Sequence, residues 1–274
     1  NENGVETISD YFNKDLAKHI RENYGVPNLI TSHNVLAHIE DFSGVMNAIK
    51  TLMDRESVFI FEVGYFLDVF KNLWFDTIYH EHLDYHTIAP LRDFFDANEM
   101  NLFDVERVDI QGGSIRNFVQ LSNGSKKIES SIDELIRLEK EIGLHRAKGI
   151  MDYQSRIEDA KNELTQMLQE IKNSGHSIAG YGAPTKSTTL MNHFELGDHF
   201  IDYIIDDSPQ KSGFLTPGSH IPIVNRDQAK KLNRPDYLII FAWSFFDEIY
   251  ARLKGKIDKK TKIILPFPEI KIVE

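Results

Sequence analysis

The sequence contains no cysteine, and this absence removes several chemistries at once. Disulfides, thiolate nucleophiles and cysteine-ligated zinc sites all require that residue, so none of them can operate in this chain. Histidine nitrogen and carboxylate oxygen also bind zinc, so a zinc site made of those ligands stays open on composition alone.

Excess positive charge and long apolar runs are also lacking. Acidic residues outnumber basic ones 42 to 31, which gives a formal charge of -11 and no basic face of the kind that attracts a nucleic-acid backbone. The longest apolar runs, such as YLIIFAW at 237–243, fall far short of the roughly 20 residues that a membrane helix needs. No signal peptide opens the sequence. We therefore expect a soluble, cytoplasmic protein without nucleic-acid or membrane partners.

The pattern of apolar residues predicts two α/β units. With 274 residues, 41% of them apolar, the chain can bury one large core or two ordinary ones, and the internal pattern favours two. Helix-type and strand-type patterns alternate from VETISDYF to SVFIFEVGY, which predicts parallel strands joined by crossover helices. A helix over PLRDFFDANEM and two strands flanking the turn Gly112-Gly113 follow. We expect this first unit to cover residues 1–123.

A charged, helix-periodic stretch from about Lys126, broken once near Gly143, predicts a helical connector over residues 124–174. The alternation restarts after it with the strand HSIAGYG, a helix over PTKSTTLMNHF and the strands FIDYIIDD, YLIIFAW and KIILPF. Residues 175–274 are therefore predicted to form a second, smaller α/β unit. Parallel sheets bind ligands at the carboxyl ends of their strands, and three polar segments lie at such ends. They are Asn34–His38, TIYHEHLDY at 77–85, and GYGAPTK at 180–186.

The segment GYGAPTKSTT follows an apolar strand and opens a helix. Gly180 and Gly182 permit close backbone approach, and a helix N-terminus offers N–H groups to an anion. Lys186 and the three hydroxyl residues after it, Ser187, Thr188 and Thr189, could add to that site. The pattern favours a phosphate-binding turn over a purely structural one. It lacks the third glycine of the dinucleotide fingerprint, which disfavours a nicotinamide-dependent oxidoreductase, and it also lacks the Walker spacing.

Acidic and amide side chains at two other strand ends carry weaker signals. Asp206 and Asp207 end the strand after the glycine turn, where a ribose-binding acid often lies, although acids at such positions also form turns. Asn34 ends a buried strand and is the better ligand candidate of its segment. A lone histidine such as His38 is more often structural than catalytic.

The stretch TIYHEHLDY packs two histidines, two acids and two tyrosines into nine residues. Helical spacing would place His80 and Asp84 on one face, whereas extended spacing would put His80 beside His82. A zinc site would need further ligands at readable spacing, and we predict no metal site in this chain. One histidine oriented by a neighbouring carboxylate suffices for proton abstraction, so we favour acid/base chemistry. A solvated polar loop is the alternative.

Five motifs together resemble the sugar C-methyltransferases, which methylate a nucleotide-linked keto-deoxysugar. In order, they are NVLAHI, FIFEVGY, FDTIYHEHLDY, GGSIR, and GYGAPTKSTTLMN followed by DDSPQKSGFLTPGSHIPI. The resemblance spans nearly the whole chain. It implies that residues 1–123 are part of a class I, S-adenosylmethionine-dependent methyltransferase domain with a Rossmann-like fold. It also implies that residues 175–274 are a smaller, Rossmann-like domain that binds the nucleotide-sugar.

The same resemblance implies roles for particular residues. His82 would be the general base, assisted by Tyr79 and Glu81, while His80 would be structural. Cofactor contacts would come from Asn34, His38 and Glu62. Contacts to the nucleotide-sugar would come from Arg116, Gly182, Ala183, Lys186, Ser187 and Thr188.

The chain also departs from the family pattern. Neither the glycine-rich first loop of a class I methyltransferase nor the acid after its second strand is found before residue 30, and the family's cysteine-ligated zinc module is missing. We therefore expect an incomplete first domain whose open sheet edge is covered by a missing N-terminal segment or by another chain. Gln111 stands where the family pattern has histidine, so no catalytic role carries over to it. A non-catalytic nucleotide-sugar-binding protein is the alternative to an enzyme.

Overall fold

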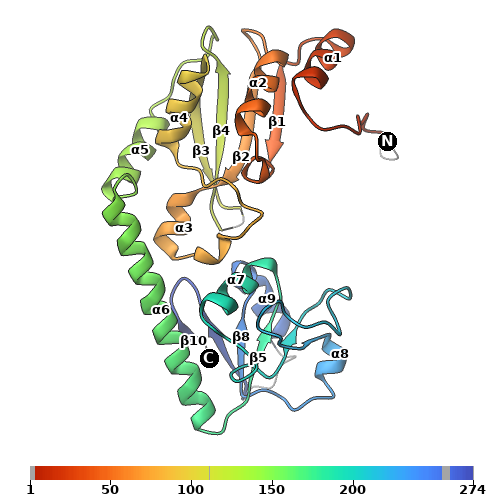
Figure 1. Cartoon of the computed structure of the whole chain (residues 1–274), viewed down its shortest axis with the longest axis vertical. Helices are drawn as coiled ribbons and strands as arrows, with labels where there is room; N and C mark the ends of the chain where they lie inside the picture. Colours follow the sequence, from red (N-terminus) through yellow and green to blue (C-terminus); the bar gives the residue numbers. More distant parts are fainter. Residues whose placement is uncertain (1–3, 111, 255–259, 274) are drawn as a thin grey trace. The chain divides into compact units, whose positions relative to one another are not determined.

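The computed structural model describes residues 4–110, 112–254 and 260–273, which form two compact units. The first contains the chain up to Leu67 together with Glu81–His145, and the second contains Asp68–His80 and the chain from Arg146 onward (Figure 1). Both units combine helices with a sheet that has parallel strands, which confirms the mixed α/β class. Within the described ranges, no helix is both long and apolar enough to cross a bilayer.

The first unit is built on a four-stranded sheet in the order β1-β2-β4-β3. β1 and β2 run parallel, whereas β4 is antiparallel to both of its neighbours, β2 and β3. The bounds of its strands and helices are β1 Leu29–His33, β2 Val58–Gly64, β3 Met100–Val108, β4 Ser114–Leu121, α1 Lys14–Tyr24, η1 Leu36–His38, α2 Phe42–Leu52, α4 Ile88–Ala97 and α5 Ser131–Glu141. The predicted crossover helix and the predicted β3–β4 pair are both confirmed. Residues 5–12 form no helix or strand.

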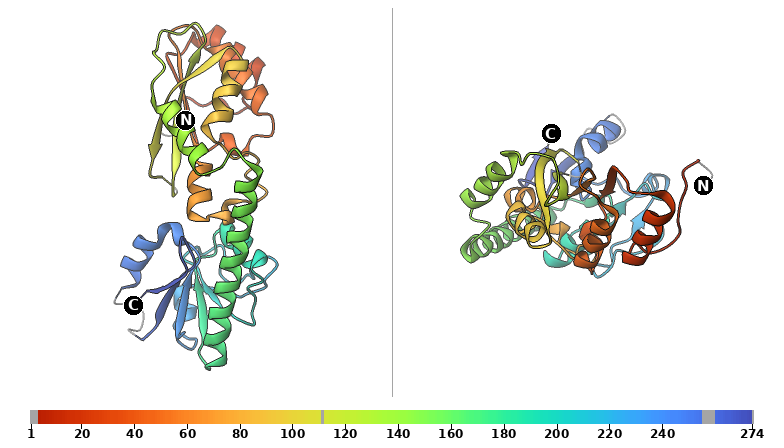
Figure 2. Two further views of the ribbon diagram at one scale, coloured as in Figure 1. Left: turned by 90° about the vertical axis from the view of Figure 1, so that its left-hand side faces the viewer. Right: turned by 90° about the horizontal axis from the view of Figure 1, so that it is seen from above.

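Apolar residues two positions apart on β2 form the centre of the first core. Phe59 and Phe61 are both fully buried, and their rings stack with centroids 5.3 Å apart. Helices α2 and α4 lie against the first sheet (Figure 2, left) and contribute to the same core. The ring centroid of Phe95 on α4 lies 5.9 Å from that of Phe61. The aromatic side chains of β2 thus anchor this strand in the first core.

A buried carboxylate caps helix α4 from a distant part of the chain. Thr87, at the N-cap position, makes no side-chain hydrogen bond to the helix. Instead, Glu139 of α5 accepts hydrogen bonds from the backbone N–H of Ile88 at 2.6 Å and of Ala89 at 3.3 Å. It also accepts one from the hydroxyl of Tyr65 at 2.9 Å. Glu139 is only 4% exposed, and its charge is stabilised by the donors at the helix N-terminus.

Two helices separated by a glycine fill the predicted connector. α5 ends at Glu141, and α6 runs from Ala147 to Asn173. Between them Gly143 has a φ of 84°, a left-handed conformation that favours glycine and ends the helix. The predicted break near Gly143 is thus confirmed. α5 belongs to the first unit and α6 to the second; the predicted domain boundaries stay predictions.

The second unit has a six-stranded sheet in the order β10-β9-β8-β5-β6-β7, parallel except for β10. The chain starts in the middle of the sheet at β5, continues to β6 and β7 on one side, and then crosses to β8 and β9 on the other. The strand order therefore reverses between β5 and β8, where the crevice at the carboxyl ends of a doubly wound sheet binds ligands. The bounds of these strands are β5 Ile178–Tyr181, β6 Ile204–Ile205, β7 Ile223–Val224, β8 Tyr237–Ile240, β9 Lys262–Leu265 and β10 Lys271–Val273.

The remaining elements of the chain are helical. They are α3 Phe66–Asn72, η2 Phe75–Thr77, α7 Thr185–His193, α8 Arg226–Ala229, η3 Trp243–Phe245 and α9 Phe246–Leu253. The sequence patterns anticipated α7 but not α3, α8, α9 or the short strands β7 and β10. The predicted strand FIDYIIDD contracts to the two residues of β6.

Candidate functional site

The stretch TIYHEHLDY at 77–85, here called the histidine loop, is irregular after the end of η2, so neither the helical nor the extended spacing applies. The boundary between the two units falls inside it, between His80 and Glu81. On the side of the second unit, the ring centroids of Tyr79 and His80 lie 6.3 Å apart, with their planes at 75°. On the side of the first unit, Glu81 is exposed and His82 is half-buried.

The predicted base lies beside a predicted cofactor residue. The imidazole rings of His82 and His38 have centroids 5.0 Å apart, and their planes are tilted by 56°. His38 Nδ1 donates to the backbone carbonyl of Glu81 at 2.7 Å, which leaves Nε2 as the acceptor when the ring is neutral. The backbone N–H groups of Leu83 and Asp84 both donate to the Ala37 carbonyl, at 2.8 Å and 3.3 Å. These bonds fix the histidine loop to η1.

Asn34 turns the chain away from the sheet at the end of β1. Its φ of 52° is left-handed, a conformation that asparagine tolerates better than most residues, and its N–H donates to the Glu62 carbonyl at 2.9 Å. A groove of about 1030 Å³ runs along β1 and is lined by residues that include Ile30, Ser32 and Val35. Ser32 and Val35 flank Asn34 in the sequence, so the groove reaches the end of β1, although Asn34 itself does not line it.

Glu62 and Arg116, which the resemblance assigns to different ligands, form an ion pair. They are Cα partners across β2 and β4, and Arg116 Nη2 lies 3.1 Å from Glu62 Oε2. Glu62 is 3% exposed, so the guanidinium compensates a carboxylate that has lost its water. Arg116 also lies 3.5 Å from Glu106. Any ligand hydroxyl that binds Glu62 must share it with Arg116. Gln111, just before this strand, lies outside the described residues.

The predicted phosphate turn lies at the switch point of the second sheet. Gly182 has a φ of 84°, and a Cβ there would come within 2.7 Å of the Ala242 Cβ, so only glycine fits. Pro184, at the N-cap of α7, makes no side-chain bond to the first N–H groups of that helix. Lys186 Nζ lies over the Trp243 ring, 5.5 Å from its centroid. A helix start without a side-chain cap and with a lysine beside it favours an anion.

Two of the predicted phosphate contacts instead hold the turn itself. The Ala183 N–H donates to Asp206 Oδ2 at 2.7 Å, and the Ser187 hydroxyl donates to the Pro184 carbonyl at 2.7 Å. Lys211 Nζ donates to the Ala183 carbonyl at 2.8 Å. Asp206, considered from the sequence as a ribose-binding acid, therefore fixes the shape of the turn. Lys186 and the partly buried Thr188 are not used in this way.

A buried acid that the sequence did not single out lies close to Lys186. Asp76 is fully buried, and its Oδ2 accepts a hydrogen bond from Trp243 Nε1 at 2.6 Å. Burial raises the pKa of Asp76 to about 6, against the lowering effects of the Trp243 bond and the Lys186 charge. Burial also lowers the pKa of Lys186. The available signal was an acid directly after two aromatic residues, Trp74 and Phe75, at the start of the FDTIYHEHLDY motif.

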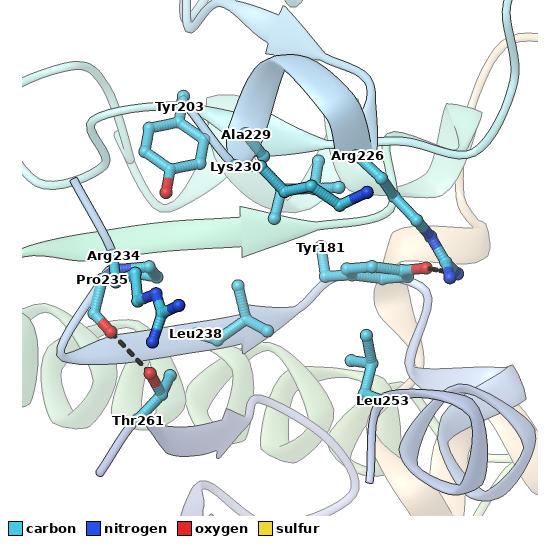
Figure 3. Close-up of a pocket in the computed structure, with 11 residues that line it drawn as sticks. Tyr181, Tyr203, Arg226, Ala229, Lys230, Arg234, Pro235, Leu238, Leu253 and Thr261 are labelled. Atoms are coloured by element: carbon cyan, nitrogen blue, oxygen red, sulfur yellow. Dashed lines mark hydrogen bonds between the residues drawn. The ribbon is translucent and has the colours of Figure 1, made fainter. Parts of the chain in front are cut away.

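Asp207 takes part in a separate network on the second unit. Arg226 donates to both of its carboxylate oxygens, at 2.6 Å and 2.8 Å, and the Tyr181 hydroxyl donates at 2.8 Å. These hydrogen bonds, with the Arg226 bond as the largest cause, hold the pKa of Asp207 below its usual range. Tyr181 and Arg226 also line a cavity of about 530 Å³ over the sheet (Figure 3). Asp207 is thus already paired rather than open to a ribose.

Clusters of three or more histidine and acidic side chains with metal-binding geometry do not occur among the residues that the structure describes. The candidate residues of the first unit are histidines and a buried carboxylate, and those of the second unit are a lysine and another buried carboxylate.

The fold and these candidate residues describe an α/β protein with a histidine loop after one sheet and a cationic turn at the switch point of another. Residues 109–268 match the family described as C-methyltransferase C-terminal domain. The chain therefore belongs to this C-methyltransferase family, which confirms the resemblance seen in its motifs. It is 30% identical over 273 residues to C-methyltransferase NovU from Streptomyces niveus. That similarity covers 100% of this chain and 65% of the length of the relative.

Proposed function

We propose that this chain acts in an S-adenosylmethionine-dependent C-methyltransferase whose substrate is a nucleotide-linked keto-deoxysugar. One observation carries the proposal: in a chain of this family, the His82 ring lies 5.0 Å from that of His38, a residue at the end of the segment that follows β1. A base beside the cofactor-binding edge of a sheet suits proton abstraction followed by methyl transfer.

In this proposal His82 removes the proton from the carbon next to the sugar ketone. The electron pair of the broken C–H bond forms the enolate, and the proton moves to the imidazole. Glu81 and Tyr79 assist by orienting the base and by stabilising its charged form. When bound, S-adenosylmethionine supplies an electrophilic methyl group to the enolate carbon. Asn34, His38 and Glu62 are the residues of this chain proposed to contact it.

The proposal is tested by product analysis with the complete natural gene product. A nucleotide-linked keto-deoxysugar and methyl-labelled S-adenosylmethionine are expected to give label on a sugar carbon. Without the cofactor, the proton next to the ketone should still exchange with deuterium from the solvent. Binding of the sugar with neither exchange nor methylation would instead support the non-catalytic alternative. Label on oxygen alone would contradict C-methylation.

We further propose that part of the cofactor site lies in polypeptide beyond this chain. β1 is the last strand on its side of the described sheet, and Leu29 on it is 55% exposed. Such an edge leaves backbone groups available for another strand. Zinc, which the family resemblance places in an N-terminal domain, would also lie outside this chain.

We therefore expect the chain alone to bind S-adenosylmethionine poorly, because Asn34, His38 and Glu62 provide only one side of the pocket. Calorimetry should find a dissociation constant weaker than roughly 100 μM, corresponding to less than about 5.5 kcal/mol of binding free energy. The complete gene product, measured under the same conditions, is the control and should bind more tightly. Micromolar binding by the chain alone would contradict the proposal.

Lys186→Ala is expected to weaken nucleotide-sugar binding roughly 10- to 100-fold at low ionic strength, because it removes a charge-assisted contact to the diphosphate. Salt screens a charge, so this loss should shrink as ionic strength rises. Thr188→Val removes a hydroxyl and no charge, and its smaller loss should not depend on salt. Affinity and melting temperature are measured for both variants. Altered stability with unaltered affinity would indicate a purely structural turn.

A further inference from the structure

Asp76 lies in a closely packed aromatic cluster of the second unit. Its neighbour Phe75 packs on Phe194 and Phe267, with ring centroids 5.2 Å and 5.7 Å away. Trp243 packs on Trp74, with ring centroids 4.8 Å apart. These rings exclude water from Asp76, which is 0% exposed. A carboxylate in such surroundings needs hydrogen-bond donors to remain ionised.

Only one of the two carboxylate oxygens of Asp76 accepts a side-chain hydrogen bond. Oδ2 accepts the bond from Trp243 Nε1, whereas Oδ1 is buried and has no hydrogen-bond partner within the described part of the chain. The Trp243 ring that donates to Asp76 also lies under the Lys186 ammonium. The carboxylate, the indole and the lysine therefore form one connected group at the start of α7.

Few charged groups face this carboxylate. Lys186 on α7 is the charged side chain whose field lowers the pKa of Asp76, and burial opposes it more strongly. The backbone N–H groups of Asp76 itself and of Thr77 lower that pKa to a smaller extent. His193, on the same helix as Lys186, packs on Phe75 at 5.3 Å and lies 3.4 Å from Glu158. The ionised form of Asp76 therefore depends mainly on the Trp243 N–H and on Lys186.

We propose that Asp76 is a positioning residue that takes up one proton when a nucleoside diphosphate ester binds at Lys186. The bound diphosphate adds negative charge and engages the ammonium that stabilises the ionised carboxylate. Both effects favour neutral Asp76. The proton comes from solvent and can reside on Oδ1, so Oδ2 keeps its bond to Trp243. The choice of a nucleoside diphosphate ester as the ligand rests on the proposed function.

The coupling has a definite sign. The pKa of Asp76 is about 6 in the free protein and becomes higher in the complex. Between those two values the complex holds a proton that the free protein lacks, so affinity falls as pH rises above about 6. One coupled proton changes affinity by up to about tenfold per pH unit. Below about pH 6 Asp76 is protonated in both states, and its contribution to the pH dependence disappears.

Calorimetry with UDP-glucose and TDP-glucose tests the coupling from about pH 5.5 to 8. Their diphosphates are esterified at both ends, so the charge of the ligand stays constant over this range. The dissociation constant should rise at least about threefold from pH 6 to pH 8, and paired buffers of different ionisation enthalpy should report proton uptake. Asp76→Asn keeps an acceptor for Trp243 and should abolish both effects. Asp198→Asn, an exposed acid of the same unit, should retain them.

Tryptophan fluorescence gives a readout that needs no variant. The chain has two tryptophans, and both belong to the cluster. Emission should titrate near pH 6 in the free protein, and UDP-glucose or TDP-glucose should move the midpoint upward. His193→Gln should leave the midpoint in place. Binding without pH dependence, or an unmoved midpoint, would overturn the inference alone. Failure of both nucleotide-sugars to bind at every pH would contradict the proposed substrate class as well.

Discussion

Replacing His82 by asparagine is expected to lower kcat of the complete natural gene product by about 10²- to 10⁴-fold, the usual cost of losing a positioned general base. Asparagine has nearly the size of imidazole and can make hydrogen bonds, but it cannot accept the proton of the sugar. His82 is half-buried in an irregular loop that backbone bonds to Ala37 hold in place, so the fold should survive. Steady-state methyl transfer and circular dichroism measure the two properties.

His80→Asn is the matched control for this change. It alters the same residue type two positions earlier, at an exposed site, and should retain most of the activity. Exchange of the sugar α-proton in deuterated solvent should be lost in the His82 variant and kept in the His80 variant. A His82 variant with more than about a tenth of the normal kcat would rule out the assignment of the base.

Arg116→Ala is expected to lower the free energy of unfolding by about 3 to 5 kcal/mol, because it leaves the buried carboxylate of Glu62 without its cation. The ion pair spans two central strands of the first sheet, and Glu62 is 3% exposed. Chemical unfolding in urea, followed by circular dichroism, measures the change.

Two further variants show whether burial causes the loss. Arg92→Ala removes an arginine whose ion pair with Asp93 is exposed, and should cost less than about 1 kcal/mol. The double change Glu62→Gln and Arg116→Met removes both charges and should recover much of the loss. If Arg116→Ala costs no more than Arg92→Ala, Glu62 does not depend on its partner, and its carboxylate is open to a ligand.

The periodic pattern of apolar and polar residues correctly predicted those helices and strands that are long enough to bury one face in a core. The β3–β4 pair, the break at Gly143 and the helix after GYGAPTK all have a local cause, either a turn residue or a helix period. The short elements β7, α8 and β10 have too few residues for a period to emerge. Tertiary packing, rather than local propensity, determines them.

Contacts between distant residues explain why the site was only partly predictable. Asp76 and Trp243 are 167 residues apart, and no local pattern links them. The pairing of Glu62 with Arg116 depends on strand register, which the two residue types alone do not reveal. The hydrogen bond from the His38 ring to the Glu81 carbonyl could not be predicted from local sequence either, because its acceptor lies 43 residues further along the chain. The motif resemblance identified the residues, but not their partners.

The Glu139 cap of α4 has a consequence for the order of assembly. The donors at Ile88 and Ala89 start the helix that closely follows the histidine loop, and their acceptor is 51 residues further along the chain for Ile88. During synthesis the first turn of α4 emerges well before α5, so its N–H groups face water until α5 docks. Docking of α5 then supplies the carboxylate acceptor that this turn has no local side chain to provide. The start of α4 is thus completed by a helix that comes later in the chain and contributes no residue to the proposed chemistry.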